Sequence, residues 1–358
     1  MSIYDYLDNV EHNKADVEFR KVQLTGNSTY IISLPKKWVK SLNLKPGSQL
    51  LISKKDNTTL MITPKELIKP LKYKTATVIV SEKDKVDSII RKIVSLYLIG
   101  YNIIRVKSRE ERILYQQKDD IKNFIRKKLV GAEILSESSN ELEVRVLIGY
   151  PELSLEDSLR RAYIIAISML EDSLKALKTL DTELAKEVIS VDDEIDRLYL
   201  YMVRQLKAAV ENETILRSIG LKSQRDCLGY RIIAKFVERI ADHAVKIAEN
   251  VLSLKDPIDN LTYEKIRAMG LFAKNMFEEA INSLYKKDCI LADNVIARAK
   301  SVTNLEKEFI KYIEGIKNTD TSTIKLITES IRRTAEYASD IAEIVLNINI
   351  EQFVQTET

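Results

Sequence analysis

The stretch from Ser154 to about Asn349 constrains the fold more than any other part of the sequence, because it has a helical pattern almost throughout. Apolar residues recur there at helical spacing, and its only proline is Pro257. That proline lies in the loop-forming segment SLKDPIDN and divides the stretch into two halves of about a hundred residues. We expect three helices in each half, at 154–178, 182–212, 215–254, 261–286, 288–316 and 320–348.

The two halves share a pattern of acidic residues, which indicates an internal repeat. In the third helix of each half, a glutamate and an aspartate lie four residues apart at the same phase, as Glu238/Asp242 and Glu336/Asp340. The comparison rests on two pairs of segments, 191–199 with 302–310 and 235–251 with 333–348. The sequence therefore predicts an all-α bundle of two three-helix repeats, at 154–255 and 261–349.

Acidic residues four apart on a helix lie on the same face, so each pair places two carboxylates side by side. Like charges at this spacing destabilise an isolated helix by about 0.2–0.5 kcal/mol, and a bound cation would reverse the sign of that contribution. Oxygen ligands suit hard divalent ions such as magnesium or manganese, and they also accept iron. We therefore expect divalent or iron ions to be held by carboxylates drawn from Asp192, Asp196, Glu238, Asp242, Glu306, Glu336 and Asp340.

Two features of the sequence weigh against a metal in both repeats. Val302 stands where the first half has Asp192, so of that pair the second half keeps only Glu306, in the place of Asp196. Basic residues also lie one turn from the acids, as Lys235 does from Glu238. Ordinary ion pairs along the helices therefore remain an alternative to a metal site.

The N-terminal part of the chain is basic, although the whole chain carries a formal charge of only +3. Residues 1–150 have 27 basic and 18 acidic side chains, whereas residues 151–358 have 29 and 35. The excess is densest between residues 17 and 63, where eight Lys and Arg face one Glu and one Asp. A basic module of this kind is a candidate for binding polyanions, although a lysine-rich surface that only maintains solubility has the same charge.

Residues 17–64 have the pattern of four short strands around one short helix. Turn-forming residues separate VEFRKVQL, STYIISL, QLLISK and TTLMIT, and PKKWVKSL forms a helix with Pro35 in its first turn. So small a module cannot bury much apolar surface alone, so we expect a homodimer or a higher homo-oligomer. The side chains that we expect to contact DNA are Arg20, Lys21, Asn27, Lys36, Lys37, Lys40 and Lys54.

Residues 71–150 have the pattern of a small α/β domain. The run TATVIVS is typical of a buried strand, KVDSIIRKIVSLYLIG forms a helix that ends at Gly100, and YNIIRV forms a second strand. After the polar span SREERILYQQKDD, the helix IKNFIRKKL ends at Gly131, and AEILSE and ELEVRVLIG form a hairpin. The domain has no glycine-rich phosphate motif and no catalytic dyad, which favours a spacer or dimer-locking role over a sensing one.

The N-terminal module resembles a known DNA-binding family. The run from Gly26 through Ser33-Leu34-Pro35-Lys36-Lys37 to Leu44-Lys45-Pro46-Gly47 resembles the AbrB and SpoVT swapped-hairpin family, to which MazE-type antitoxins belong. The resemblance implies that two chains interleave into one small β-barrel that places basic loops on DNA. The loop of residues 25–29 lacks the arginine that the family often uses, which favours phosphate contact over base reading.

About 200 C-terminal residues resemble PhoU, a family of phosphate uptake regulators built of two three-helix repeats. The resemblance is carried by Arg231, by Val237–Ala244 and by the Asp192/Asp196 pair. It implies that the acidic motifs bind metal clusters, and both motifs are intact in the first repeat. An AbrB-like module joined to PhoU-like repeats also resembles a prokaryotic, mostly archaeal, arrangement in which the regulator itself binds DNA.

These observations favour a DNA-binding transcriptional regulator linked to phosphate uptake, whose bundle senses phosphate status through metal or through a phosphate transporter component. The alternative is a sequence-tolerant architectural DNA-binding protein. A carboxylate-bridged metalloenzyme is disfavoured, because two cysteines and two histidines form no zinc motif or triad and no nucleophile accompanies the acids. We expect a cytoplasmic protein without membrane insertion, since no apolar run approaches roughly 18 residues and the acidic N-terminus lacks a signal sequence.

Overall fold

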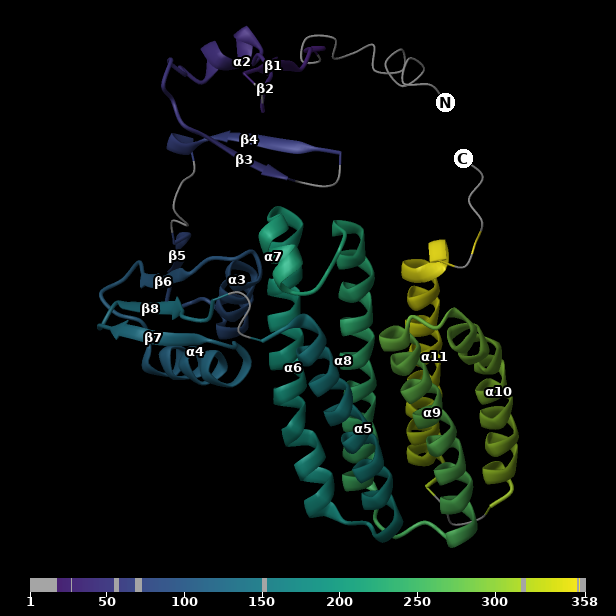
Figure 1. Cartoon of the computed structure of the whole chain (residues 1–358). Coiled ribbons are helices and arrows are strands. Elements are labelled where there is room, and N and C mark those ends of the chain that lie inside the picture. The colour runs from purple at the N-terminus through teal and green to yellow at the C-terminus, as the bar shows by residue number, and fades with distance from the viewer. Residues whose placement is uncertain are drawn as a thin grey trace. The chain divides into compact units, whose positions relative to one another are not determined.

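The computed structural model of the chain (Figure 1) describes residues 18–26, 28–54, 58–67, 73–149, 153–316, 320–352 and 354. The chain divides into two compact units, Met1–Lys72 and Tyr73–Thr358. Asn27, one of the residues expected to contact DNA, lies outside the described residues.

The first unit consists of two short antiparallel hairpins and a short helix. Strands β1 (Gln23–Thr25) and β2 (Thr29–Ile31) form one two-stranded sheet, and β3 (Leu50–Lys54) and β4 (Leu60–Pro64) form another. Helix α2 (Lys36–Ser41) lies between the hairpins in sequence, and the 3-10 turn η1 (Lys65–Leu67) follows β4. The expected order of elements is confirmed, but the described strands of this single chain form no closed barrel. The strand expected at 17–24 starts only at Gln23, which pairs with Ile31 at the end of β2.

The hairpins bury almost none of their apolar side chains within a single chain. Phe19 is 79% exposed, Tyr30 74% and Leu60 64%. Among the described residues from 18 to 67, Pro64 alone is buried. Covering apolar surface contributes about 25 cal/mol per Å², so this unit gains stability from any further surface that covers its strands.

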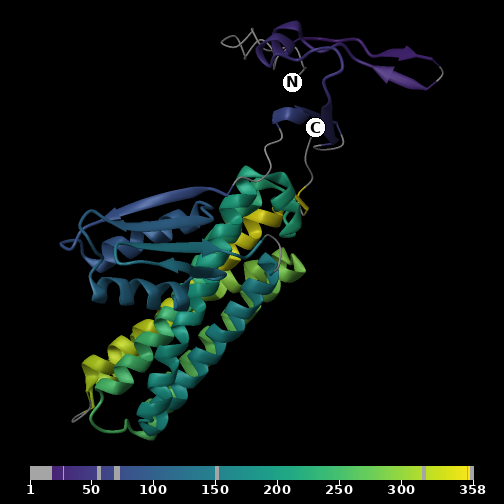
Figure 2. The ribbon, with the colours of Figure 1, turned by 90° about the vertical axis from the view of Figure 1, so that its left-hand side faces the viewer.

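The second unit begins with a four-stranded sheet that carries two helices on one face (Figure 2). Its strands run in the order β5-β6-β8-β7, with β5 and β6 parallel and the other neighbours antiparallel. Their bounds are β5 (Thr75–Val80), β6 (Ile103–Ser108), β7 (Ala132–Glu137) and β8 (Glu141–Val146). Helices α3 (Val86–Leu98) and α4 (Tyr115–Lys128) pack on the alternate, buried residues of these strands. We call residues 73–149 the α/β domain.

Helix α4 is longer than the sequence pattern predicts, which corrects the expectation of a helix confined to 121–129. It begins at Tyr115, inside the span expected to be a polar loop. Gln117 is buried there, and its amide donates hydrogen bonds to the carbonyls of Ser81 (3.1 Å) and Asp84 (2.9 Å). A polar residue thus takes a core position because buried loop carbonyls need donors.

The rest of the second unit is a bundle of two three-helix halves that share one apolar core (Figure 1). The first half has α5 (Leu155–Thr179), α6 (Thr182–Glu211) and α8 (Gln224–Ser253), with the short α7 (Glu213–Ser218) between the last two. The second half has α9 (Asn260–Lys286), α10 (Cys289–Glu314) and α11 (Thr321–Asn349), followed by the 3-10 turn η2 (Ile350–Gln352). Helices α8 and α11 pack against each other between the halves. Within the described residues, no helix has the length and apolar character needed to cross a membrane.

Side-chain caps determine where the long helices of the bundle begin, because each cap accepts a hydrogen bond from the first turn. These caps are Ser154, Asp181, Ser223, Asp259, Asp288 and Asp320. The prediction of one helix over 215–254 is wrong. The chain turns at Gly220 with a φ of +87°, and α8 starts after a capping box between Ser223 and Asp226.

Arg204 of α6 joins the bundle to the α/β domain. The residue is 1% exposed, and its guanidinium donates to the backbone carbonyls of Tyr97 and Tyr101, the latter at 3.1 Å. It also lies 4.8 Å from the centroid of the Tyr97 ring. Leu200, one turn earlier on α6, packs against the core of the α/β domain. The two parts of the second unit are therefore held together by a buried cation whose donors are used.

Replacing Arg204 by Met should loosen the α/β domain from the bundle. The change keeps much of the side-chain volume but removes a charged donor from the carbonyls of Tyr97 and Tyr101, and a hydrogen bond to a charged group is worth about 1.5–3 kcal/mol. We expect faster hydrogen–deuterium exchange in residues 97–103 and a lower first thermal transition. Lys207→Met, at an exposed position of the same helix, is the control. Equal exchange in the two variants would contradict the anchoring role of Arg204.

Candidate functional site

The four acids expected in the first repeat come together between α6 and α8. Asp192 and Asp196 lie on α6, Glu238 and Asp242 lie on α8, and the two helices pack along each other. Burial, and then the negative charges of Asp196 and Asp242, raise the pKa of Asp192 to about 6. Burial also raises the pKa of Glu238 and that of Asp242. We call these four residues the first cluster. Burial is the main cause of the raised pKa of three of its carboxylates, and their ionised forms need positive charge nearby.

Two lysines supply part of that charge. Lys128, the last residue of α4, reaches from the α/β domain to Asp193 Oδ1 at 2.5 Å and Asp196 Oδ2 at 2.7 Å. Lys235 lies on α8 itself, with its Nζ 2.5 Å from Glu238 Oε2, so the ion pair expected from their spacing is present. Burial lowers the pKa of Lys128, but the hydrogen bonds to Asp193 and Asp196 outweigh this effect and raise it above 10.5. Lys128 therefore stays charged.

The donor chemistry of the first cluster fits a hard cation. Asp192 Oδ1 is buried without a hydrogen-bond partner, which is unfavourable for a carboxylate oxygen. The other donors are carboxylate oxygens too, which magnesium and manganese prefer. In the present arrangement of the described residues, no three acidic, histidine or cysteine side chains converge closely enough to hold a metal ion. An ion here would be held by the first cluster and would have to share it with Lys128.

Two acids of the second repeat, Glu306 and Glu336, pair with an arginine instead. The Nε atom of Arg332 on α11 lies 2.7 Å from Glu306 Oε2 on α10, and its Nη1 atom pairs with Glu336 one turn along α11. Arg333 adds a contact to Glu336 at 3.2 Å. Val302 is 1% exposed and belongs to the core, so it provides no ligand. We call Glu306, Glu336 and Asp340 the second cluster. Arg332 and Arg333 of the same repeat pair with Glu306 and Glu336, whereas the cation that acts on Asp340 is Arg239 of α8.

Asp340 and His243 lie beside these groups on α11 and α8. Burial raises the pKa of Asp340, and the charges of Glu343 and Glu336 add to this effect. The His243 ring packs beside Tyr337, with 5.8 Å between centroids. Burial and then the neighbouring cations lower the pKa of His243 to about 4, so this ring is neutral at pH 7.

The basic residues expected to contact DNA are exposed in the first unit. Lys36, Lys37 and Lys40 lie along α2, Arg20 and Lys21 precede β1, and Lys54 ends β3. Arg20 pairs with Glu18, which offsets part of its charge. Lys36 and Lys40 are four residues apart and so share one side of α2. The helix therefore presents a small group of exposed cations.

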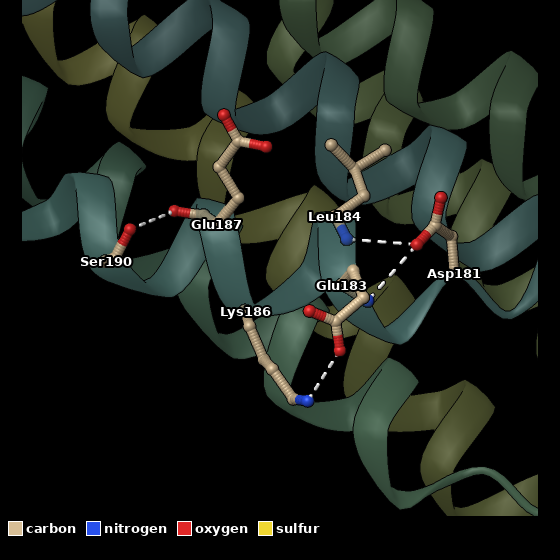
Figure 3. Close-up of a pocket in the computed structure, with 6 residues that line it drawn as sticks. All are labelled: Asp181, Glu183, Leu184, Lys186, Glu187 and Ser190. Carbon is tan, nitrogen blue, oxygen red and sulfur yellow. Dashed lines mark hydrogen bonds and ion pairs between the residues drawn. The ribbon is translucent and has the colours of Figure 1, made fainter.

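An open hollow at the start of α6 is a further candidate, but its polar groups bond within the helix (Figure 3). Asp181 caps α6 by accepting from the backbone N–H groups of Glu183 and Leu184. Lys186 pairs with Glu183 at 2.7 Å, and Ser190 donates to the carbonyl of Glu187 at 2.8 Å. These are the bonds of an ordinary helix start, and they indicate no chemistry beyond capping.

The sequence pattern did not reveal the two cations that matter most to the clusters. Arg332 lies four residues before Glu336, so helical spacing alone could have placed it beside that acid. Lys128 lies 68 residues before Asp196 and on another domain, and no local pattern connects the two. Its role follows only from how the α/β domain packs on α6.

Asp192→Asn should stabilise the protein at neutral pH but not at acid pH. The folded pKa of Asp192, about 6, exceeds its usual 3.8, so its ionisation reduces stability as the pH rises from about 4 to about 6. Asparagine removes that loss, which is about 1 kcal/mol once solvent screening of this half-buried group is included. Thermal melts without divalent ions should show a higher Tm than wild type at pH 7.5 and no gain at pH 4.

The control for this prediction is Glu187→Gln, an exposed acid of the same helix. It should change the Tm little at either pH. A stabilisation by Asp192→Asn that is equal at pH 4 and pH 7.5 would show that packing, not charge, is responsible.

Comparisons with known families match both units. Residues 159–251 and 266–345 match the PhoU domain, so each half of the bundle is matched separately. Residues 23–69 match the family described as antidote-toxin recognition MazE, bacterial antitoxin. That range runs from β1 through η1.

Individual relatives match the bundle. A phosphate-specific transport system accessory protein PhoU homolog from Borreliella burgdorferi is 26% identical over 205 residues, which cover 52% of this chain and 88% of the relative. A homolog of the same description from Aquifex aeolicus is 29% identical over 153 residues, which cover 40% of this chain and 65% of the relative. The crystal structure of PhoU from Pseudomonas aeruginosa is similar in fold, with a TM-score of 0.50 and 21% identity over 54% of this chain and 94% of that one. The helical bundle is therefore similar to the PhoU domain in both of its halves, and the first unit is similar to the MazE family.

Proposed function

We propose that this protein is a DNA-binding transcriptional regulator linked to phosphate uptake. The observation that carries the proposal is the presence, in one chain, of a MazE-type domain with exposed basic residues and a pair of PhoU domains. The relatives of the bundle are described as accessory proteins of a phosphate-specific transport system, which supports the link to phosphate. In this proposal the first unit binds DNA and the bundle is the sensor.

The DNA-binding form that we propose is a homodimer. The exposed apolar side chains of the first unit, such as Phe19 and Tyr30, would be covered if the hairpins of two copies interleaved. Two copies would also bring two sets of the α2 lysines to one DNA. Each neutralised phosphate releases counterions, and this supplies affinity without any base contact.

The sensing part of the proposal has two forms. In the first, the carboxylates of the first cluster hold a divalent or iron ion, supported by the unpartnered Asp192 Oδ1. In the second, the bundle contacts a component of a phosphate transporter, supported by the description of its relatives. Both forms place the signal in the PhoU domains and the response in the MazE-type domain.

A sequence-tolerant architectural role is the second candidate, and the β1–β2 loop favours it. Residues 25–29 offer no arginine to form a bidentate contact with a base edge. Lysines such as Lys36 and Lys37 contact phosphates regardless of sequence. A regulator should prefer its own sites to bulk DNA by roughly 10³ or more, and an architectural protein should not.

Binding of the full chain to its own upstream DNA and to random DNA, measured by fluorescence at several salt concentrations, tests the proposal. We expect tight, salt-sensitive binding that favours the upstream DNA. Lys36→Gln/Lys37→Gln should weaken binding to both DNAs and reduce the salt slope by about two per chain. The control is Lys307→Gln/Lys311→Gln, at exposed positions of α10. Equal affinity for both DNAs would favour the architectural role, and an absence of binding would overturn both.

Metal analysis of purified protein dialysed against manganese chloride tests the sensing part. Asp192→Asn/Glu238→Gln removes two charged carboxylates from the first cluster, so we expect it to lower the bound manganese to the background level. Glu187→Gln on the same helix should retain the wild-type content. Equal manganese in the two variants would rule out a cation in the first cluster and leave the transporter contact as the sensing route.

A further inference from the structure

The two clusters are neutralised by cations of different origin. In the second cluster, Arg332 lies on α11 itself, one turn from Glu336, and so cannot move far from its partners. In the first cluster, the cation that reaches Asp196 is Lys128, which belongs to the α/β domain. Its side chain is 16% exposed, and its ammonium also contacts Asp193 at 2.5 Å. The charge of the first cluster is therefore balanced partly by Lys235 of α8 itself and partly by Lys128, which belongs to a separate structural element.

We propose that Lys128 and a divalent cation compete for the first cluster, so that occupancy of the cluster controls whether the end of α4 is seated on α6. The inference rests on the proposed function in one respect, the binding of a cation by these carboxylates. Asp196 is the shared ligand. When a divalent ion binds there, Lys128 experiences repulsion in place of attraction and its contact with α6 is lost.

The geometry limits this movement to one end of the contact. Arg204 lies eight residues beyond Asp196 on α6, about 12 Å along the helix, and holds the carbonyls of Tyr97 and Tyr101. That anchor is buried and remote from the cluster, whereas Lys128 meets α6 through ion pairs to Asp193 and Asp196, beside the packing of α4 along α6. Release of Lys128 therefore weakens the seating of the C-terminal end of α4, while Arg204 keeps the α3 side of the α/β domain attached.

The coupling is reciprocal. If seating of α4 disfavours the ion, then the ion disfavours seating of α4 by the same factor. The α/β domain precedes the bundle in sequence and directly follows the first unit, so its attachment is a physical link between the PhoU domains and the MazE-type domain. This gives the α/β domain a role beyond that of a spacer.

The experiment uses the full chain and manganese chloride as the probe. Manganese affinity is measured by calorimetry, and seating of α4 by hydrogen–deuterium exchange in residues 121–131. In wild type, manganese should speed exchange in this segment. Lys128→Met should bind manganese roughly fivefold or more tightly and show fast exchange that no longer responds to the ion. Two control variants should resemble wild type. Lys127→Met changes an exposed neighbour of Lys128 whose Nζ atom lies 3.9 Å from Asp193 Oδ2, and Lys128→Arg keeps the positive charge.

The outcomes separate this inference from the proposed function. If wild type and Lys128→Met bind manganese equally while Asp196→Asn does not bind it, the first cluster holds the ion but the competition is overturned. If manganese binds but leaves exchange in residues 121–131 unchanged, the coupling is overturned as well. If no variant binds manganese, both the inference and the metal form of sensing fail. Far-ultraviolet circular dichroism of each variant establishes that it is folded.

Discussion

Carboxylates that face one another inside a helical bundle require positive charge nearby, and this requirement determines much of the structure described here. Burial and mutual repulsion raise the pKa of Asp192 to about 6, so the first cluster is unfavourable as it stands. Lys128 and Lys235 compensate part of that charge, and the Lys128 contact also holds the α/β domain against α6. A local electrostatic requirement thus becomes a contact between domains.

The two repeats show that one backbone arrangement can meet this requirement in different ways. Glu336 and Asp340 occupy the phase of Glu238 and Asp242, yet Glu306 and Glu336 of the second cluster pair with Arg332. A guanidinium can bond two carboxylates at once and cannot be deprotonated in proteins, so it is a durable replacement for a metal ion. The charges of Glu306 and Glu336 are consequently compensated inside the second repeat.

Much of the fold follows from the sequence because local rules and tertiary packing agree. The long helices of the bundle match their apolar periodicity, and Ser or Asp caps place their starts within a few residues. Agreement fails where a polar or small residue has a tertiary role. Gln117 is polar but buried, so the start of α4 was missed, and apolar residues on both sides of Gly220 concealed the break before α8. The carboxylate pairs could be predicted because four-residue spacing is local, whereas Lys128 could not, because its partner lies on another domain.

The ion pairs of the second unit differ in how far apart their partners lie in the sequence. In the second unit, acids and bases are interleaved, and most of the ion pairs described here lie within one helix or between adjacent elements, where they contribute little individually. The Lys128 contact differs because it is partly buried and joins groups 68 residues apart in sequence, in two different parts of the second unit. It acts beside the packing of Leu200 on the core of the α/β domain and an exposed ion pair between Lys74 and Glu211, whereas the buried Arg204 bonds backbone carbonyls. If a cation competes with Lys128 as proposed, the ion pairs at the end of α4 respond to it and the hydrogen bonds of Arg204 do not.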